Sequence, residues 1–217
     1  MPKLAVFDCD GTLVDGQASI CEAMETAFAA ASLAAPDRHL IRRIVGLSLP
    51  QALQMLAPDA SEDQHAIALQ SYKDAFRASR MNGTLEEPLF AGMAELLDRL
   101  RGAGWALAVA TGKSDRGLTS CLASHGLTDH FVSLQTADRH PSKPNPAMLE
   151  AALFEAGAKP GEAVMIGDTT FDIVMARAAN VRAIGVDWGY HGPDELLAEG
   201  AAAVATSCPH LEELLNA

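Results

Sequence analysis

Apolar residues in this chain occur in two patterns, as short unbroken runs and as runs spaced like one face of a helix. Residues 4–7 form an unbroken run, which is typical of a parallel strand buried on both faces. Further strands are predicted at 105–110, 131–134, 163–166 and 181–186, with an edge strand at 201–206 and a terminal helix at 210–215. Helical spacing between these strands predicts an α/β fold with a parallel sheet and right-handed crossovers.

Residues 15–85 show only the helical pattern. Apolar residues recur at helical spacing from Ile20 to Phe76, and no strand pattern interrupts them. Asn82-Gly83 and Pro88 then mark a turn back toward the sheet. We therefore expect an inserted all-α unit at 15–85, and a sheet-containing unit made of residues 1–14 and 86–217.

Two acids follow the first predicted strand. Because side chains alternate along an extended backbone, Asp8 and Asp10 should point the same way, out of the carboxyl edge of the sheet. Gly11 allows a tight turn, and Thr12 can fix it by a local hydrogen bond. Two carboxylates this close repel each other unless a cation or a shared proton intervenes. The pair indicates a metal site or an acid/base site, and a solvated turn is the alternative.

Other polar residues follow later strands. Thr111 and Gly112 come after 105–110, Lys143 lies in the loop beyond 131–134, and Asp168 and Asp172 follow 163–166. In a parallel sheet these ends meet at one edge, although each residue alone could belong to an ordinary turn. Hard oxygen ligands favour Mg²⁺, which commonly shares a substrate phosphate. A nearby lysine and hydroxyl could hold phosphoryl oxygens.

The overall charge limits the partners. The chain has 28 acidic and 16 basic residues, a net charge of −12, which argues against nucleic acid or an anionic membrane as a partner. No apolar run is long enough to cross a bilayer, and no leader precedes the first strand, so we expect a cytoplasmic protein. The four cysteines lack metal-like spacing. Cys9, between the two acids, is favoured as a small filler over a redox switch.

Taken together, these motifs resemble those of the haloacid dehalogenase-like hydrolases, with 8–12, Thr111, Lys143-Pro144 and 167–172 in the order of that family. The inserted helices resemble the cap of its phosphoglycolate phosphatase-like and β-phosphoglucomutase-like members. The resemblance implies a Rossmann-like core with an α-helical cap. It also implies a Mg²⁺-dependent phosphatase that hydrolyses a small phosphorylated metabolite through an aspartyl-phosphate, as a monomer or homodimer.

The resemblance also implies roles for individual residues. Asp8 would be the nucleophile, Asp10 the general acid and base, and Thr111 and Lys143 the groups that hold the phosphoryl group. The implied metal set is Asp8, Asp10 through its backbone carbonyl, Asp168 and Asp172. The expected substrate-binding set is Cys9, Asp10, Thr111, Gly112, Lys143, Arg42 and Arg43.

Some alternatives stay open at this stage. A β-phosphoglucomutase-like phosphomutase would use the same residues, and a two-component receiver domain resembles the site more remotely. Asp10 disfavours the dehalogenases, which lack that second acid. Gly16 and Asn145 stand where many relatives have a small hydroxyl residue and an acid. We expect at least one of the cap arginines, Arg42, Arg43, Arg77 or Arg80, to set substrate choice.

Overall fold

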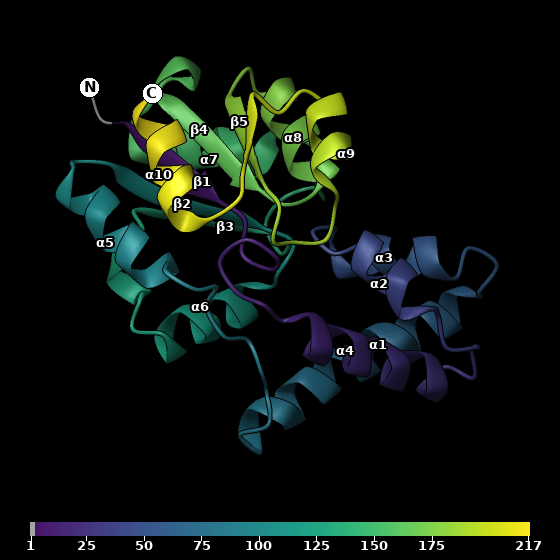
Figure 1. The fold of residues 1–217 in the computed structure, drawn as a ribbon. Helices are drawn as coiled ribbons and strands as arrows, with labels where there is room; N and C mark the ends of the chain where they lie inside the picture. The colour runs from purple at the N-terminus through teal and green to yellow at the C-terminus, as the bar shows by residue number, and fades with distance from the viewer. Residues whose placement is uncertain (1–2) are drawn as a thin grey trace.

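The computed structural model describes residues 3–217. Its centre is a six-stranded sheet of order β3-β2-β1-β4-β5-β6, in which every neighbouring pair is parallel (Figure 1). The strands are β1 (Leu4–Phe7), β2 (Ala106–Thr111), β3 (Ser133–Thr136), β4 (Ala163–Gly167), β5 (Arg182–Val186) and β6 (Ala203–Ala205). The predicted α/β class with a Rossmann-like parallel sheet is confirmed.

Helices cover both faces of the sheet, as the unbroken apolar strands require. Ala5 and Phe7 of β1 face one layer, whereas Leu4 and Val6 face the other. The first layer holds α5 (Met93–Gly102), α6 (Asp115–Ser124) and α10 (Cys208–Asn216), and the second holds α7 (Ala147–Ala156), α8 (Thr170–Ala178) and α9 (Pro193–Ala198). Two short 3-10 turns, η1 (Thr128–His130) and η2 (Pro160–Glu162), precede β3 and β4.

Four further helices lie beside the sheet and its covering layers (Figure 1). They are α1 (Gln17–Ala30), α2 (Arg38–Arg43), α3 (Leu49–Leu56) and α4 (Glu62–Met81), and we call them the cap. Their apolar faces form a hydrophobic cluster of their own, with Met24, Phe28 and Leu53 almost fully buried. Within residues 3–217, no helix combines the length and apolar character needed to cross a membrane.

The two segments that connect the cap to the sheet run side by side. Val14 and Leu89 form an antiparallel bridge, the Asp15 N–H donates to the Pro88 carbonyl at 2.8 Å, and the Phe90 N–H donates to the Leu13 carbonyl at 3.0 Å. The predicted division of the chain at 14/15 and 85/86, which stays a prediction, falls in these segments.

Two elements differ from the sequence-based expectation. We expected a strand at 131–134, but β3 begins two residues later, because its buried positions include polar residues that satisfy one another. The Gln135 amide donates to Ser133 Oγ at 2.8 Å, and that hydroxyl donates to Glu155 at 2.6 Å. Helix α9 was not expected, since its six residues are too few for a helical period to show.

The strand order indicates the edge of the sheet where a ligand could bind. The chain leaves β1 and adds β2 and β3 on one side, and later β4, β5 and β6 on the other. Ligands of open α/β sheets bind at the carboxyl edge where the order reverses in this way. Residues that follow β1, β2 and β4 therefore meet at the expected position for a binding site.

Candidate active site

Three carboxylates meet where β1 and β4 end. Asp8 follows β1, Asp168 follows β4, and Asp172 lies in the first turn of α8. One oxygen of each lies within 4.8 Å of the others, and all three residues are fully buried. The parallel pairing of Phe7 with Ile166 puts Asp8 level with the end of β4, one residue before Asp168. Buried carboxylates this close repel each other unless cations lie among them.

Lys143 supplies one such cation. Its Nζ lies 2.9 Å from Asp8 Oδ1 and 2.7 Å from Asp172 Oδ1, and its side chain is fully buried. Burial would lower the pKa of Lys143, but the two carboxylates outweigh burial and raise that pKa above its usual value. Lys143 is therefore a charged ammonium at neutral pH. Burial raises the pKa of Asp8 to about 7, although Lys143 opposes this rise.

Asp8 has one oxygen without a partner. Its Oδ1 accepts the Cys9 N–H at 2.7 Å and pairs with Lys143. Its Oδ2 is buried and makes no hydrogen bond to any part of the chain that the structure describes. Burying a carboxylate oxygen without a partner is unfavourable. This oxygen and Asp168 therefore fit a divalent cation, and their hard oxygen donors suit Mg²⁺.

Asp168 is fixed by two donors from distant parts of the chain. Thr12 Oγ1 donates to Oδ1 at 2.8 Å, and the Tyr190 N–H donates to Oδ2 at 3.0 Å. We expected Thr12 to bond within its own turn, but it reaches across to β4 instead. A Cβ on Gly189 would lie 2.1 Å from the Asp168 Cβ, so only glycine fits there. Burial, with Asp8 and Asp172, raises the pKa of Asp168 well above its usual value.

Asp172 uses both oxygens within the protein. Its Oδ2 accepts the Thr169 N–H at 3.1 Å and the Thr169 hydroxyl at 2.7 Å. Its Oδ1 accepts the ammonium of Lys143. The structure thus brings Asp172 into the acid cluster, where its direct contacts position Lys143 and the start of α8.

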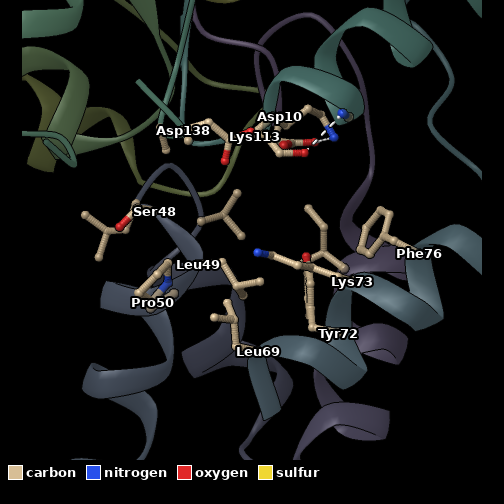
Figure 2. A pocket seen from close by; sticks show the side chains of 18 of the residues that line it. Asp10, Ser48, Leu49, Pro50, Leu69, Tyr72, Lys73, Phe76, Lys113 and Asp138 are labelled. Atoms are coloured by element: carbon tan, nitrogen blue, oxygen red, sulfur yellow. Dashed lines mark hydrogen bonds and ion pairs between the residues drawn. The ribbon is translucent and has the colours of Figure 1, made fainter. Parts of the chain in front are cut away.

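Asp10 turns toward a second lysine and stays outside the cluster of three acids. Its Oδ1 lies 2.9 Å from Lys113 Nζ, an ion pair without the alignment of a hydrogen bond. Lys113 also donates to Glu87 Oε1 at 2.6 Å, and the side chains of all three residues are nearly buried. Burial raises the pKa of Asp10, and Lys113 opposes the rise. Figure 2 shows Asp10 and Lys113 together at the core side of a cavity.

Thr111 and Gly112 lie beside this pair. Thr111 is the last residue of β2 and is 1% exposed, and its Oγ1 accepts the Lys113 N–H at 3.2 Å. A Cβ on Gly112 would lie 2.5 Å from the Leu47 carbonyl oxygen and 2.6 Å from that of Gly46. Glycine at 112 therefore lets a loop of the cap approach the end of β2.

Cys9 contacts Asp8 through its backbone N–H and not through its side chain. We expected it in the substrate-binding set, but its side chain is fully buried in the core layer beside α6. Contact with the Cys121 thiol and burial raise the pKa of the Cys9 thiol well above its usual value. This position fits the expectation that the Cys9 side chain is a small residue that fills space. The Cys9 N–H donates a hydrogen bond to Asp8.

Arg42 and Arg43 also lie elsewhere than expected, because neither lines the cavity next to Asp10. The Arg43 guanidinium donates to both oxygens of Glu195 on α9, at 2.8 and 2.7 Å. This bidentate pair lowers the pKa of Glu195 to about 2. His191 Nε2 lies 3.1 Å from the Arg43 carbonyl oxygen. Arg43 therefore joins the cap to the core.

A cavity of about 680 Å³ separates the cap from this edge of the sheet. Asp10, Gly112 and Lys113 border it on the core side. Figure 2 shows Leu49, Leu69, Tyr72 and Phe76 on the cap side, and the side chain of Lys73 pointing into the cavity from the same side. Its residues from the cap include Arg77 and Arg80, both of which were expected as candidates for substrate choice. The cavity thus reaches the edge of the sheet at Asp10, and it is large enough to hold a small molecule.

Comparison with known proteins identifies the family. Residues 5–186 match the haloacid dehalogenase-like hydrolases. The chain belongs to this family. The expected family and enzyme class, a phosphatase-type hydrolase, are confirmed by this match and by relatives named as phosphatases.

Individual relatives of this haloacid dehalogenase-like hydrolase match along most of their length. It is 38% identical to the "Probable phosphatase IndB" of Dickeya dadantii, over 91% of this chain and 86% of the relative. It is 29% identical to a phosphoglycolate phosphatase of Vibrio parahaemolyticus, over 98% of this chain and 96% of the relative. A crystal structure of a predicted phosphatase from Clostridium acetobutylicum superposes with a TM-score of 0.89 at 25% identity, covering 100% of this chain and 99% of the other.

Sequence reasoning missed several residues of the hydrolase site. Lys113 directly follows Thr111-Gly112 at a strand end, which is a signal that could have found it. Glu87 and Gly189-Tyr190 reach the site from segments without a recognisable pattern, so only the folded chain reveals them.

Proposed function

We propose that this hydrolase is a Mg²⁺-dependent phosphatase that cleaves a small phosphate monoester, with Asp8 as the nucleophile. The observation that carries the proposal is the state of Asp8. It is buried at the switch point of the sheet, with one oxygen paired to Lys143 and the other without a partner. A carboxylate held in this way can approach phosphorus, because the neighbouring cation offsets the repulsion between two anions.

In the first step, an oxygen of Asp8 attacks phosphorus and the bond from phosphorus to the alcohol oxygen breaks. Asp10 gives its proton to the departing oxygen, so that a neutral alcohol leaves and an aspartyl-phosphate forms on Asp8. The raised pKa of Asp10 supports this role, because it increases the share of the protonated form near neutral pH. Asp10 borders the cavity that would hold the alcohol.

In the second step, a water molecule attacks the phosphorus of the aspartyl-phosphate. Asp10, now a carboxylate, takes a proton from that water, and the bond between Asp8 and phosphorus breaks. Inorganic phosphate leaves, and both acids return to their starting states. Thr111 and Lys143 would hold the other phosphoryl oxygens through both steps, as a hydroxyl and an ammonium.

Asp8, Asp168 and the backbone carbonyl of Asp10 would hold Mg²⁺, with Asp172 supporting this set. A bound Mg²⁺ would supply positive charge that offsets the charge developing on the phosphoryl group. The unpartnered Oδ2 of Asp8 and the charge density of the three buried acids support this assignment. Thr12 and Tyr190 then serve to keep Asp168 in place.

We infer that the substrate is a small phosphorylated acid or sugar, since relatives along the full chain are named phosphoglycolate phosphatase. A phosphomutase would use the same residues, so the assay must separate net release of phosphate from interconversion. A receiver-like role is disfavoured, because the chain belongs to a hydrolase family and its first acid follows the first strand.

The test is the Asp8→Asn variant, assayed for phosphate release from a panel of phosphate monoesters with Mg²⁺ and after chelation. We expect loss of turnover at least 10³-fold with native-like circular dichroism, because the amide cannot form an acyl-phosphate. A neutral group should be tolerated at this position, because the pKa of Asp8 is already raised to about 7. Asp194→Asn, on the exposed start of α9, is the control.

Wild-type rates in Asp8→Asn would contradict the nucleophile, and full activity after rigorous chelation would contradict the metal. Conversion of a sugar 1-phosphate into a 6-phosphate without net release would identify a mutase instead.

A further inference from the structure

The cavity between cap and core is much larger than the leaving group of phosphoglycolate requires. Its volume is about 680 Å³. The five non-hydrogen atoms of glycolate fill about 150 Å³ at most, if each takes the ~30 Å³ share of a liquid water molecule. Cavities of several hundred Å³ commonly enclose molecules with one or more rings. The size alone therefore favours a larger alcohol.

The walls of the cavity indicate the character of that alcohol. On the cap side they are mainly apolar, and the rings of Tyr72 and Phe76 lie with centroids 5.0 Å apart. Leu49 and Leu69 lie on the same side (Figure 2). Apolar walls of this kind stabilise an apolar or flat group by removing its surface from water. Hydroxyl groups of a linear polyol that faced these apolar walls would be left without partners.

Cations without carboxylate partners border the same cavity. Within residues 3–217, neither Lys73 nor Arg77 forms an ion pair, and both line the cavity from the same side of α4, four residues apart. The side chain of Lys73 points into the cavity from the cap side (Figure 2). The acids nearby have other contacts, since Asp138 accepts the Asp115 N–H and Asp74 accepts the Gln70 amide.

These cations lie apart from the phosphoryl site. Lys143, the cation at Asp8, is fully buried and does not line the cavity. Lys113 lines it but is engaged by Asp10 and Glu87. In a chain of net charge −12, unpaired cations in one cavity favour a second anionic group on the ligand.

We propose that the substrate is a phosphate monoester whose alcohol combines a ring-sized apolar body with a second anionic group, such as a carboxylate, bound by Lys73 and Arg77. The proposal rests on the proposed phosphatase function. It narrows the substrate class, because phosphoglycolate has the anion without the body and a simple sugar phosphate has neither an apolar body nor the second charge.

Four alkyl monoesters with alcohols of similar reactivity test each part. They are ethyl phosphate, 2-phosphoglycolate, 2-phenylethyl phosphate and 2-(4-carboxyphenyl)ethyl phosphate. We expect kcat/KM to be highest for the carboxyphenyl ester, at least tenfold above the value for 2-phenylethyl phosphate. The value for 2-phenylethyl phosphate should in turn be at least tenfold above that for ethyl phosphate. Higher kcat/KM for 2-phosphoglycolate than for both aromatic esters would overturn the proposal.

Two variants assign the anion site. Lys73→Gln and Arg77→Gln should each lower the ratio of kcat/KM between the carboxyphenyl and phenylethyl esters about tenfold, mainly through KM. Arg101→Gln, an exposed arginine on α5 that does not line the cavity, is the matched control and should leave this ratio unchanged. An unchanged ratio in both cavity variants would overturn the assignment.

Binding separates this inference from the proposed function. The dissociation constants of the same four esters are measured by calorimetry on Asp8→Asn protein with Mg²⁺. If wild-type protein releases phosphate from none of them, the phosphatase proposal fails, while tighter binding of the carboxyphenyl ester still supports the subsite. Equal binding of all four esters overturns the subsite whatever the activity.

Discussion

Replacing Lys113 with methionine removes the cation that lies between two nearly buried acids. Lys113 is 2.9 Å from Asp10 and 2.6 Å from Glu87. Breaking a buried ion pair by removing one partner costs about 3–5 kcal/mol, because a buried charge is left uncompensated. In a chain of this size each kcal/mol lowers Tm by about 2–4 °C. We therefore expect Tm to fall by roughly 6–20 °C at pH 8.

The pH dependence of this effect has a definite sign. In wild-type protein the pKa of Lys113 lies well above its usual value, so the stability that Lys113 contributes is fully present between pH 5 and 8. In the variant, burial raises the pKa of Asp10 with no cation to oppose it. The folded variant then holds protons that the unfolded chain has released, and its stability falls as pH rises above 3.8, the ordinary pKa of an aspartate. The loss of Tm should be smaller at pH 5 than at pH 8.

The assay is thermal unfolding followed by circular dichroism at both pH values, with the pH profile of kcat/KM measured in parallel. The limb of that profile that reports Asp10 should move to higher pH in Lys113→Met. Lys159→Met, at an exposed position, is the control. A fall in Tm of less than 2 °C at pH 8, or an unmoved limb, would refute the reasoning about the ion pair.

Three further outcomes are expected. Mg²⁺ should raise Tm, measured by calorimetry, more at pH 8 than at pH 5. The pKa values of Asp8 and Asp168 are raised, so without metal both acids are largely protonated at low pH, and the protein is least stable at high pH, where both are charged. An equal rise in Tm at the two pH values would count against this. Gly112→Ala should lower kcat/KM about 10²-fold with little change in circular dichroism, since its Cβ meets cap backbone and must displace it. Arg43→Met should lower Tm by less than about 4 °C, because the ion pair of Arg43 with Glu195 is partly exposed and stabilises the fold by about 1 kcal/mol or less. A larger fall in Tm would show that this ion pair between cap and core contributes more to stability than expected.

Much of the carboxyl edge of the sheet could be predicted from the sequence, because it depends on local sequence patterns. An unbroken apolar run predicts a buried strand, alternation sets the direction of the acids, and parallel strands bring their ends together. These rules predict a shared position for Asp8, Thr111 and Asp168, and the structure places them at one edge, whereas their individual roles come from the family resemblance.

The remaining parts depend on contacts between distant segments. Lys113 meets Glu87, 26 residues away, and Arg43 meets Glu195, 152 residues away. The periodicity of apolar residues does not predict such pairs, because it does not distinguish one charged residue from another. Strand β3 was misplaced for a related reason, since Ser133 and Gln135 are buried through hydrogen bonds that hydropathy does not reveal.

The paired connecting segments confine the cap to a single insertion between β1 and the rest of the sheet. Its entry and exit are held together by the Val14–Leu89 bridge and by hydrogen bonds on both sides of it. None of the six strands lies between these two points, where the chain forms α1 to α4. A different helical insert joined at this junction would therefore leave the strands uninterrupted, but it would have to supply new partners for Glu195 and for the end of β2 at Gly112.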